Sequence, residues 1–201
     1  MTLTIEEQDK LLQDMQHWKR FIDVSSWNEN ILTSINADTL KKARIDGVYI
    51  KATQDTDYVN HYAYNVAGHV KSLDLLIGYY DFVSNWDISP NENIAFFSKV
   101  ISDWPRSAGV MLDVEVMSAK GVDHMNRWIQ GWTDLADQFA KYVFVYTNPW
   151  FLDQGIQIPK NARLWLAEWA SKPTLACDAW QSGTMDIDDG RLVADFDLIN
   201  I

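Results

Sequence analysis

A chain of 201 residues, 47% of them hydrophobic, is long enough to bury a substantial core as a single domain. Its 28 acidic and 17 basic residues give a formal net charge of −11, which disfavours nucleic acid as a partner because a polyanion would be repelled. No apolar run approaches the roughly eighteen residues that a membrane-spanning helix needs, so a membrane is not an expected partner either.

Metal and nucleotide sites also lack their usual sequence patterns. With one cysteine, Cys177, the chain can form neither an internal disulfide nor a CxxC pair, and its four histidines lack HExxH spacing. Glycine-rich phosphate loops and the GxSxG nucleophile motif do not occur. We therefore expect no metal ion and no cofactor, which leaves carboxylates and aromatic side chains to carry the chemistry.

The N-terminal segment 1–20, MTLTIEEQDKLLQDMQHWKR, is polar and charged where a secretory signal has an apolar core, so no signal peptide is expected. Thr4 and Glu7 have the spacing of a capping box. The apolar residues that follow at helical spacing are Leu11, Leu12, Met15 and Trp18. They predict an N-terminal helical extension that covers the domain formed by residues 21–201. The alternative is a partner-binding helix, so we expect a monomer, or a homodimer through this segment.

Short β-rich runs alternate with longer amphipathic stretches from residue 21 onward, a pattern typical of βα units around a parallel sheet. The expected strands cover 21–25, 47–53, 75–83, 109–116, 142–147, 163–169, 176–182 and 192–198. Helical patterns at 61–72, 91–104 and 122–141 separate members of the first five. Eight strands predict a closed barrel.

The gaps after the fifth strand shrink to roughly ten residues or fewer, too short for an ordinary crossover helix. The last three strands are therefore expected to close the barrel through loops, some of them antiparallel. A complete eight-helix barrel usually needs about 250 residues, so the chain length supports the same conclusion. The predicted fold class is α/β, an irregular TIM-like barrel.

Two carboxylates, Asp113 and Glu115, interrupt the apolar run GVMLDVEV of the expected fourth strand. Residues two apart in a strand point to the same side, so the two acids share a face. Such a pair is usually found on a solvated edge strand or beside a basic residue, but this run holds no basic residue. If the shared face is the barrel interior, the pair opens at the mouth. Repulsion there favours a proton on at least one acid, as a general acid requires.

Other expected strand ends also carry carboxylates: Asp23 on the first strand, and Asp195 and Asp197 on the last. The first and last strands of a closed barrel are neighbours, so these acids are expected to converge. Several acids without histidine ligands favour glycoside hydrolysis. In that chemistry one acid protonates the leaving oxygen and another group stabilises an oxocarbenium-like transition state.

The aromatic content supports a sugar ligand. Of ten tryptophans, five fall at or just past expected strand ends, where a flat ring can stack on a sugar: Trp27, Trp86, Trp150, Trp169 and Trp180. For each of these, a place in the core or at the rim explains the position equally well. Trp128 and Trp132, four apart in a helical pattern, are expected in the core.

Eight motifs coincide in order with the eight expected strands: FIDVSSWN, YIKAT, GYYDF, MLDVEV, VYTNPWF, LWLAEW, AWQSGT and VADFD. Together they resemble the lysozyme-like muramidases of glycoside hydrolase family 25, found as phage endolysins and as bacterial or fungal autolysins. The resemblance spans about residue 20 to residue 201. It implies an irregular barrel of five βα units followed by three further strands.

The resemblance also implies cleavage of the β-1,4 bond between N-acetylmuramic acid and N-acetylglucosamine in peptidoglycan. Glu115 would be the general acid, and Asp113 would orient the substrate's acetamido group or stabilise charge. Asp23 and Asp195 would complete the acidic floor, with Asp197 as the alternative to Asp195. The residues expected to contact the substrate are Tyr80, Lys51, Tyr146, Asn148, Trp165, Trp180 and Trp27.

Two positions depart from the family pattern. Gln54 stands where the family often has an acid, in KATQD instead of KATEG, and Asp81 stands where it often has a histidine, in GYYDF instead of GAYHF. We expect these changes to affect subsite shape or pH optimum and not the acid pair.

A competing hypothesis keeps the same barrel as a catalytically weak module that binds peptidoglycan or a chitin-like glycan. The clustered acids favour the enzyme, because burying like charges costs stability without helping a pure binder. Bacterial peptidoglycan is the expected partner in both cases. The enzyme hypothesis implies a protein that is made in the cytoplasm and reaches the cell wall after release or export.

Overall fold

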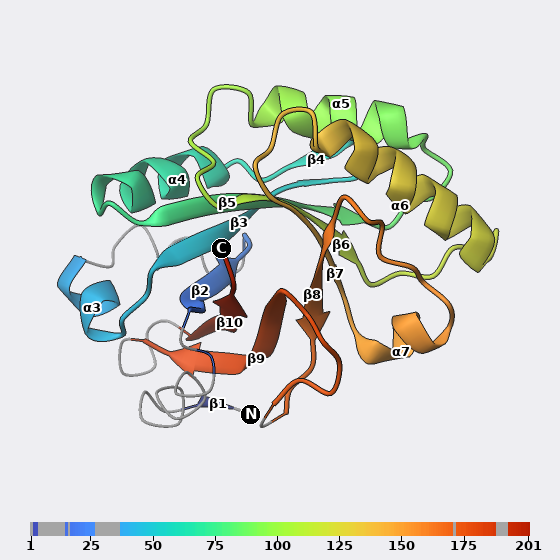
Figure 1. The fold of residues 1–201 in the computed structure, drawn as a ribbon. Helices are drawn as coiled ribbons and strands as arrows, with labels where there is room; N and C mark the ends of the chain where they lie inside the picture. The colour runs from blue at the N-terminus through green and yellow to red at the C-terminus, as the bar shows by residue number, and fades with distance from the viewer. Residues whose placement is uncertain (1, 4–14, 16, 27–36, 171, 188–192) are drawn as a thin grey trace.

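The computed structural model describes residues 2–3, 15, 17–26, 37–170, 172–187 and 193–201. Its centre is a closed barrel of eight strands (Figure 1). In spatial order these are β2 (Lys19–Val24), β3 (Gly47–Gln54), β5 (Leu76–Val83), β6 (Gly109–Val114), β7 (Val143–Thr147), β8 (Arg163–Ala167), β9 (Ala179–Asp186) and β10 (Val193–Ile199). The predicted α/β barrel is confirmed.

Seven of the barrel strands run parallel, from β2 round to β9. The last strand, β10, lies antiparallel to both β9 and β2 and closes the barrel between them. The expected antiparallel pairing near the end of the chain is therefore confined to β10. Two short strands lie outside the barrel order: β4 (Tyr58–Val59) pairs with β3, and β1 (Thr2–Leu3) pairs with β9.

Three longer helices lie together on one side of the barrel (Figure 1): α4 (Ala63–Ser72), α5 (Pro90–Val100) and α6 (Val122–Ala136). Two short ones, α3 (Ala37–Lys42) and α7 (Pro149–Asp153), follow β2 and β7. The sequence at the start of α5 explains where that helix begins. Ser89 and Glu92 form a capping box, and Pro90 occupies the first turn, where its missing N–H costs no hydrogen bond.

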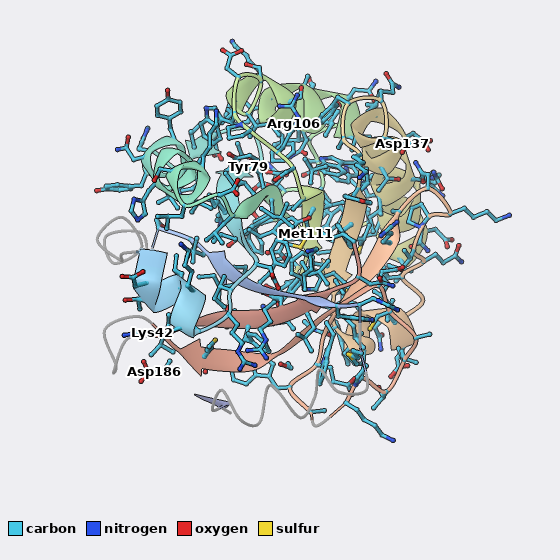
Figure 2. All side chains as sticks on the ribbon, turned by 60° about the vertical axis from the view of Figure 1, so that its left-hand side comes forward. Lys42, Tyr79, Arg106, Met111, Asp137 and Asp186 are labelled. Carbon is cyan, nitrogen blue, oxygen red and sulfur yellow. The ribbon has the colours of Figure 1, made fainter. Side chains whose placement is uncertain are left out.

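Alternation along the strands divides the apolar side chains into two layers. The outer core lies between the strands and the helices and contains, among others, Tyr79, Leu112, Trp128 and Trp132. The inner core fills the barrel with Phe21, Tyr49, Met111, Phe144 and Trp165, together with smaller residues. Figure 2 labels one member of each layer, Tyr79 and Met111. The helical tryptophans Trp128 and Trp132 are buried, as predicted.

Aromatic side chains hold the inner core together. The ring of Tyr49 meets that of Trp165 edge-on, with centroids 4.7 Å apart, and its hydroxyl donates to the Ala108 carbonyl at 2.6 Å. Gly78 makes room for this ring, because a Cβ at that position would lie 2.4 Å from Tyr49 Cε1. The barrel is therefore a packed interior below its mouth and not a pore.

The helix predicted over residues 1–20 needs correction at both ends. Thr2–Leu3 is a strand, and β2 begins at Lys19, so the predicted domain boundary falls inside the first barrel strand. Most of the segment between them lies outside the described residues, including Thr4, Glu7, Leu11 and Leu12. Met15 and Trp18 pack, partly buried, against the outer core.

Gly109 forms the start of β6, the strand that carries Asp113. It begins β6 with φ +92°, and a Cβ there would lie 2.2 Å from the Tyr142 carbonyl oxygen, which accepts a hydrogen bond from Val110 N at 2.9 Å. Gly109→Ala should lower the free energy of unfolding by about 2 kcal/mol or more in urea denaturation, because strain and overlap add. Gly68→Ala, at an exposed position of α4 where a Cβ meets nothing within 4 Å, should raise the free energy of unfolding by about 0.5–1 kcal/mol. Equal stability of Gly109→Ala and the unaltered chain would contradict this account.

Candidate active site

Five carboxyl groups gather at the end of the barrel where the parallel strands finish. Asp23 lies near the end of β2, Asp113 near the end of β6, and Glu115 is the first residue after β6. Asp195 and Asp197 lie on β10, with Asp195 directly opposite Asp23 in the strand register. The antiparallel course of β10 brings its first residues to the same end as the last residues of β2. The predicted convergence of Asp23, Asp113, Glu115 and Asp195 is therefore present.

The exposure of these acids differs. Glu115 is exposed, Asp23 and Asp195 are half-buried, and Asp113 retains 8% of its accessible surface. Asp197 is fully buried. The five groups therefore run from the solvent at Glu115 into the barrel interior at Asp197.

The pKa of every one of these acids is raised. Loss of surrounding water is the largest cause for each, and neighbouring negative charge adds to it for Asp113 from Glu115 and Asp23. For Glu115 the added charge is that of Asp195, while Lys51 opposes the rise in pKa. Burial and the Asp195 charge raise the pKa of Asp23 from 3.8 to about 7. The site therefore holds protons at pH values where isolated carboxyls have lost them.

Gln181 on β9 orients Asp23 and was not among the predicted site residues. Its Nε2 donates to Asp23 Oδ2 at 2.9 Å, and its Oε1 accepts from Tyr146 Oη at 2.9 Å and from Trp169 Nε1 at 3.4 Å. Because the amide is satisfied on both sides, it links three strand ends around one carboxylate. The available signal was alternation, since Ala179, two residues earlier, belongs to the inner core.

Asp113 has a different environment, because its Oδ1 is buried and accepts no hydrogen bond from the part of the chain that the structure describes. The positive charge of Lys51 on β3 opposes the rise in the pKa of Asp113. Burial lowers the pKa of Lys51 itself, against the pull of the Asp113 charge. Lys51 Nζ donates to Gln54 Oε1 at 3.0 Å and lies 4.6 Å from the centre of the Phe82 ring.

The predicted substrate contacts are only partly brought together. Tyr80 and Tyr146 belong to the inner core and keep 6% and 8% of their surface accessible. Burial raises the pKa of both phenols, and the charges of the clustered acids add to the rise. Asn148 lies after β7, where its side chain caps α7 by accepting from Phe151 N at 3.3 Å. Trp27 lies outside the described residues.

Two predicted tryptophan contacts need correction. Trp165 is fully buried inside the barrel, where its Nε1 donates to Asp197 Oδ1 at 3.0 Å, so it supports the acids from below. Trp180 faces the outer core, fully buried, and donates to the Glu168 carbonyl at 2.7 Å. It cannot line the mouth, because it neighbours inward-facing Gln181 and so points to the opposite side of β9. Trp169, by contrast, is 54% exposed beside Gln181.

Asp81 lies behind the barrel wall and not in the mouth. It is fully buried, and its Oδ1 accepts from Thr53 Oγ1 at 2.5 Å. Its Oδ2 has no partner among the described residues, and burial raises its pKa from 3.8 to about 7. An effect of this residue on pH dependence would act through the fold and not through substrate contact.

The described residues contain no group of three or more histidine, cysteine, aspartate or glutamate side chains that could hold a metal ion. Within the same part of the chain, no helix has the length and apolar character required to cross a membrane.

Comparisons with known proteins agree on one family. Residues 22–185 match the family model described as glycosyl hydrolases family 25. An autolytic lysozyme from Clostridium acetobutylicum is 27% identical over 161 residues, which cover 79% of this chain and 48% of that protein. The chain thus spans about half the length of the curated relative that it matches.

Solved structures share the fold at low sequence identity. A family 25 glycosyl hydrolase from Bacillus anthracis superposes with a TM-score of 0.77 at 17% identity, over 92% of this chain and 89% of that one. The modular autolysin LytC from Streptococcus pneumoniae, solved with a synthetic peptidoglycan ligand, gives 0.76 at 16% identity, over 91% of this chain and 47% of that one. These similarities support the barrel assignment.

Substitution of Asp81 tests how the stability of the folded chain depends on pH. Because its pKa is higher in the folded chain than the ordinary 3.8, its contribution is complete below about pH 4 and is lost as the pH rises to about 7. Asp81→Asn should therefore melt near the unaltered protein at pH 4 and above it at pH 8. Asp103→Asn, on an exposed loop, should leave the difference in melting temperature between the two pH values unchanged. If the melting temperatures of Asp81→Asn and the unaltered chain differed by the same amount at both pH values, the raised pKa of Asp81 would be refuted.

Proposed function

The chain belongs to glycosyl hydrolases family 25, and from this premise we propose that it is a muramidase that hydrolyses bacterial peptidoglycan. The bond cleaved is the β-1,4 linkage between N-acetylmuramic acid and N-acetylglucosamine. The observation that carries the proposal is the graded cluster of carboxyls at the barrel mouth, running from exposed Glu115 to buried Asp197. A cell-wall polymer approaches such a cluster from the solvent side, where Glu115 lies.

Glu115 is the general acid in this mechanism. It is exposed, so a glycosidic oxygen can reach it, and its raised pKa keeps the proton available at a higher pH than an ordinary glutamate does. Transfer of that proton to the bridging oxygen accompanies cleavage of the bond between this oxygen and the anomeric carbon. The second sugar leaves as an alcohol, water supplies the hydroxyl to the anomeric carbon, and the proton that this water loses restores the carboxyl of Glu115.

Asp113 binds and orients the substrate's acetamido group. Asp113 retains 8% of its accessible surface at the barrel mouth, so a substrate N–H can donate to the exposed part of this carboxyl. The same carboxyl lies close enough to Glu115 for the two charges to raise the pKa of Asp113. Loss of the proton from Glu115 therefore changes the electrostatic environment of Asp113. Such coupling is expected of a residue that responds to the charge developing in the transition state.

Asp23 and Asp195 form the remaining acidic floor under the sugar. They face each other across β2 and β10, and Gln181 holds Asp23 in place. Tyr80, Tyr146 and Lys51 surround this floor and are proposed to contact the glycan, with exposed Trp169 as a stacking surface beside Gln181. The alternative, a glycan-binding barrel without significant activity, does not explain why several like charges are buried together at a cost in stability.

Glu115→Gln should abolish lysis, because it removes the proton donor and keeps the side-chain shape. We expect a loss of about 10²- to 10⁴-fold in turbidity assays on purified cell walls, with an unchanged melting temperature. Glu92→Gln, the same replacement on exposed α5, preserves a capping box and should lyse walls normally. Activity of Glu115→Gln within tenfold of the unaltered protein would refute the assignment. Failure of the unaltered protein to lyse walls that it binds would favour the binding module.

Asp113→Asn should also be strongly impaired, by about 10²-fold, since an amide cannot follow the change in charge at Glu115. Asp103→Asn is the matched control away from the barrel mouth. Cleavage rates on peptidoglycan fragments measure the effect directly. A near-normal rate in Asp113→Asn would assign this carboxyl to the fold alone.

A further inference from the structure

Asp197 is the one member of the acid cluster that no solvent reaches. It lies two residues after Asp195 on β10, opposite Phe21 of β2, and none of its surface is accessible. Trp165 Nε1 donates to its Oδ1 at 3.0 Å from β8, which lies beyond β9 in the barrel. The pairing of β10 with β9 shifts register between Phe196 and Asp197. A substrate at the mouth meets half-buried Asp195 first, so Asp197 cannot touch the sugar.

The second carboxyl oxygen of Asp197, Oδ2, is buried without a conventional hydrogen-bond donor among the described residues. Asp23 lies two residues from Phe21, the β2 partner of Asp197, and points to the same inward face, so the two carboxyls are diagonal neighbours placed to share a hydrogen bond. Two carboxyls can form such a bond only if one of them carries a proton. The deeper burial of Asp197 decides which one, because the charged form is better solvated at half-buried Asp23.

We propose that Asp197 is a positioning residue that retains a proton inside the barrel and donates it in a hydrogen bond to Asp23. Asp23 is thereby held from two strands, by Gln181 of β9 and by Asp197 of β10. This inference rests on the role proposed for Asp23 in the muramidase reaction. It also explains the two acids of the last strand, since Asp195 faces the substrate and Asp197 supports Asp23.

The surroundings of Asp197 favour its neutral form. The titratable groups that face it are Asp23 on β2, Asp195 on β10, Tyr49 on β3 and Tyr146 on β7. Burial and the charges of the two aspartates raise the pKa of Asp197, and its hydrogen bond lowers the pKa of Asp23 relative to burial alone. As the pH rises past the point where Asp197 loses its proton, two buried carboxylates oppose each other. Repulsion between them should then displace Asp23 from its position in the floor of the site.

Two substitutions separate positioning from simple space filling. In Asp197→Asn the amide donates permanently to Asp23, and its oxygen still accepts from Trp165. Lysis at pH 5 should stay within about threefold of the unaltered protein, and the alkaline limb of the kcat/KM profile should move to higher pH. Asp197→Ala removes the donor and leaves Trp165 Nε1 unpaired, so activity should fall by about tenfold or more across the whole profile.

A third measurement does not depend on activity. In protein labelled with ¹³C at the aspartate carboxyls, Asp197 should remain protonated at a pH where Asp23 has titrated, and Asp197→Ala should raise the pKa of Asp23 by about one unit. Asp197 found ionised at neutral pH would overturn the proposal. So would Asp197→Asn with an unshifted alkaline limb, or one that folds normally but is inactive at pH 5. Retained activity in Glu115→Gln would instead refute the proposed function and leave the carboxyl titration to decide on Asp197.

Discussion

The antiparallel pairing of β10 with β2 is the constraint on which the site depends. It closes the barrel and sets Asp195 directly opposite Asp23 in the strand register. The parallel register from β2 through β5 to β6 then fixes Asp113 across the same end of the barrel. Because the inner core below is filled with aromatic rings, the acids can neither sink further nor draw in basic partners from underneath.

Closing the barrel brings like charges together at an electrostatic cost, and the proposed chemistry depends on the raised carboxyl pKa values that result. Each acid loses solvating water, and the charges accumulate around Asp23 and Asp113, so their protons are retained to higher pH. The aromatic and aliphatic contacts of the two cores supply the stability that such a cluster opposes. Lys51 offsets part of the negative charge at Asp113 and Glu115, but burial also lowers its own pKa. This arrangement favours transfer of the Glu115 proton to a glycosidic oxygen once the substrate is bound.

Alternation and gap length were sufficient to predict the barrel, because strands and crossover helices leave periodic patterns even in a single sequence. They also predicted the meeting of Asp113 and Glu115 with Asp23 and Asp195. The error at Trp180 arose because proximity to a strand end does not fix which side a residue faces. Observed β9 begins at Ala179, not at residue 176, and Gln181 faces inward instead. Gln181 escaped prediction because an amide among polar residues carries no distinctive pattern until its partners are known.

Hydrolysis by this site requires a transferable proton on Glu115 in the folded chain, and titration of that carboxyl is the decisive measurement. With six glutamates in the sequence, ¹³C labelling at their side-chain carboxyls gives few resonances, and Glu115→Gln identifies the one of interest. The pKa of Glu115 should lie above the ordinary glutamate value and coincide with the alkaline limb of kcat/KM for wall hydrolysis. A Glu115 that titrates at or below the ordinary value, with hydrolysis continuing undiminished above it, would contradict the account.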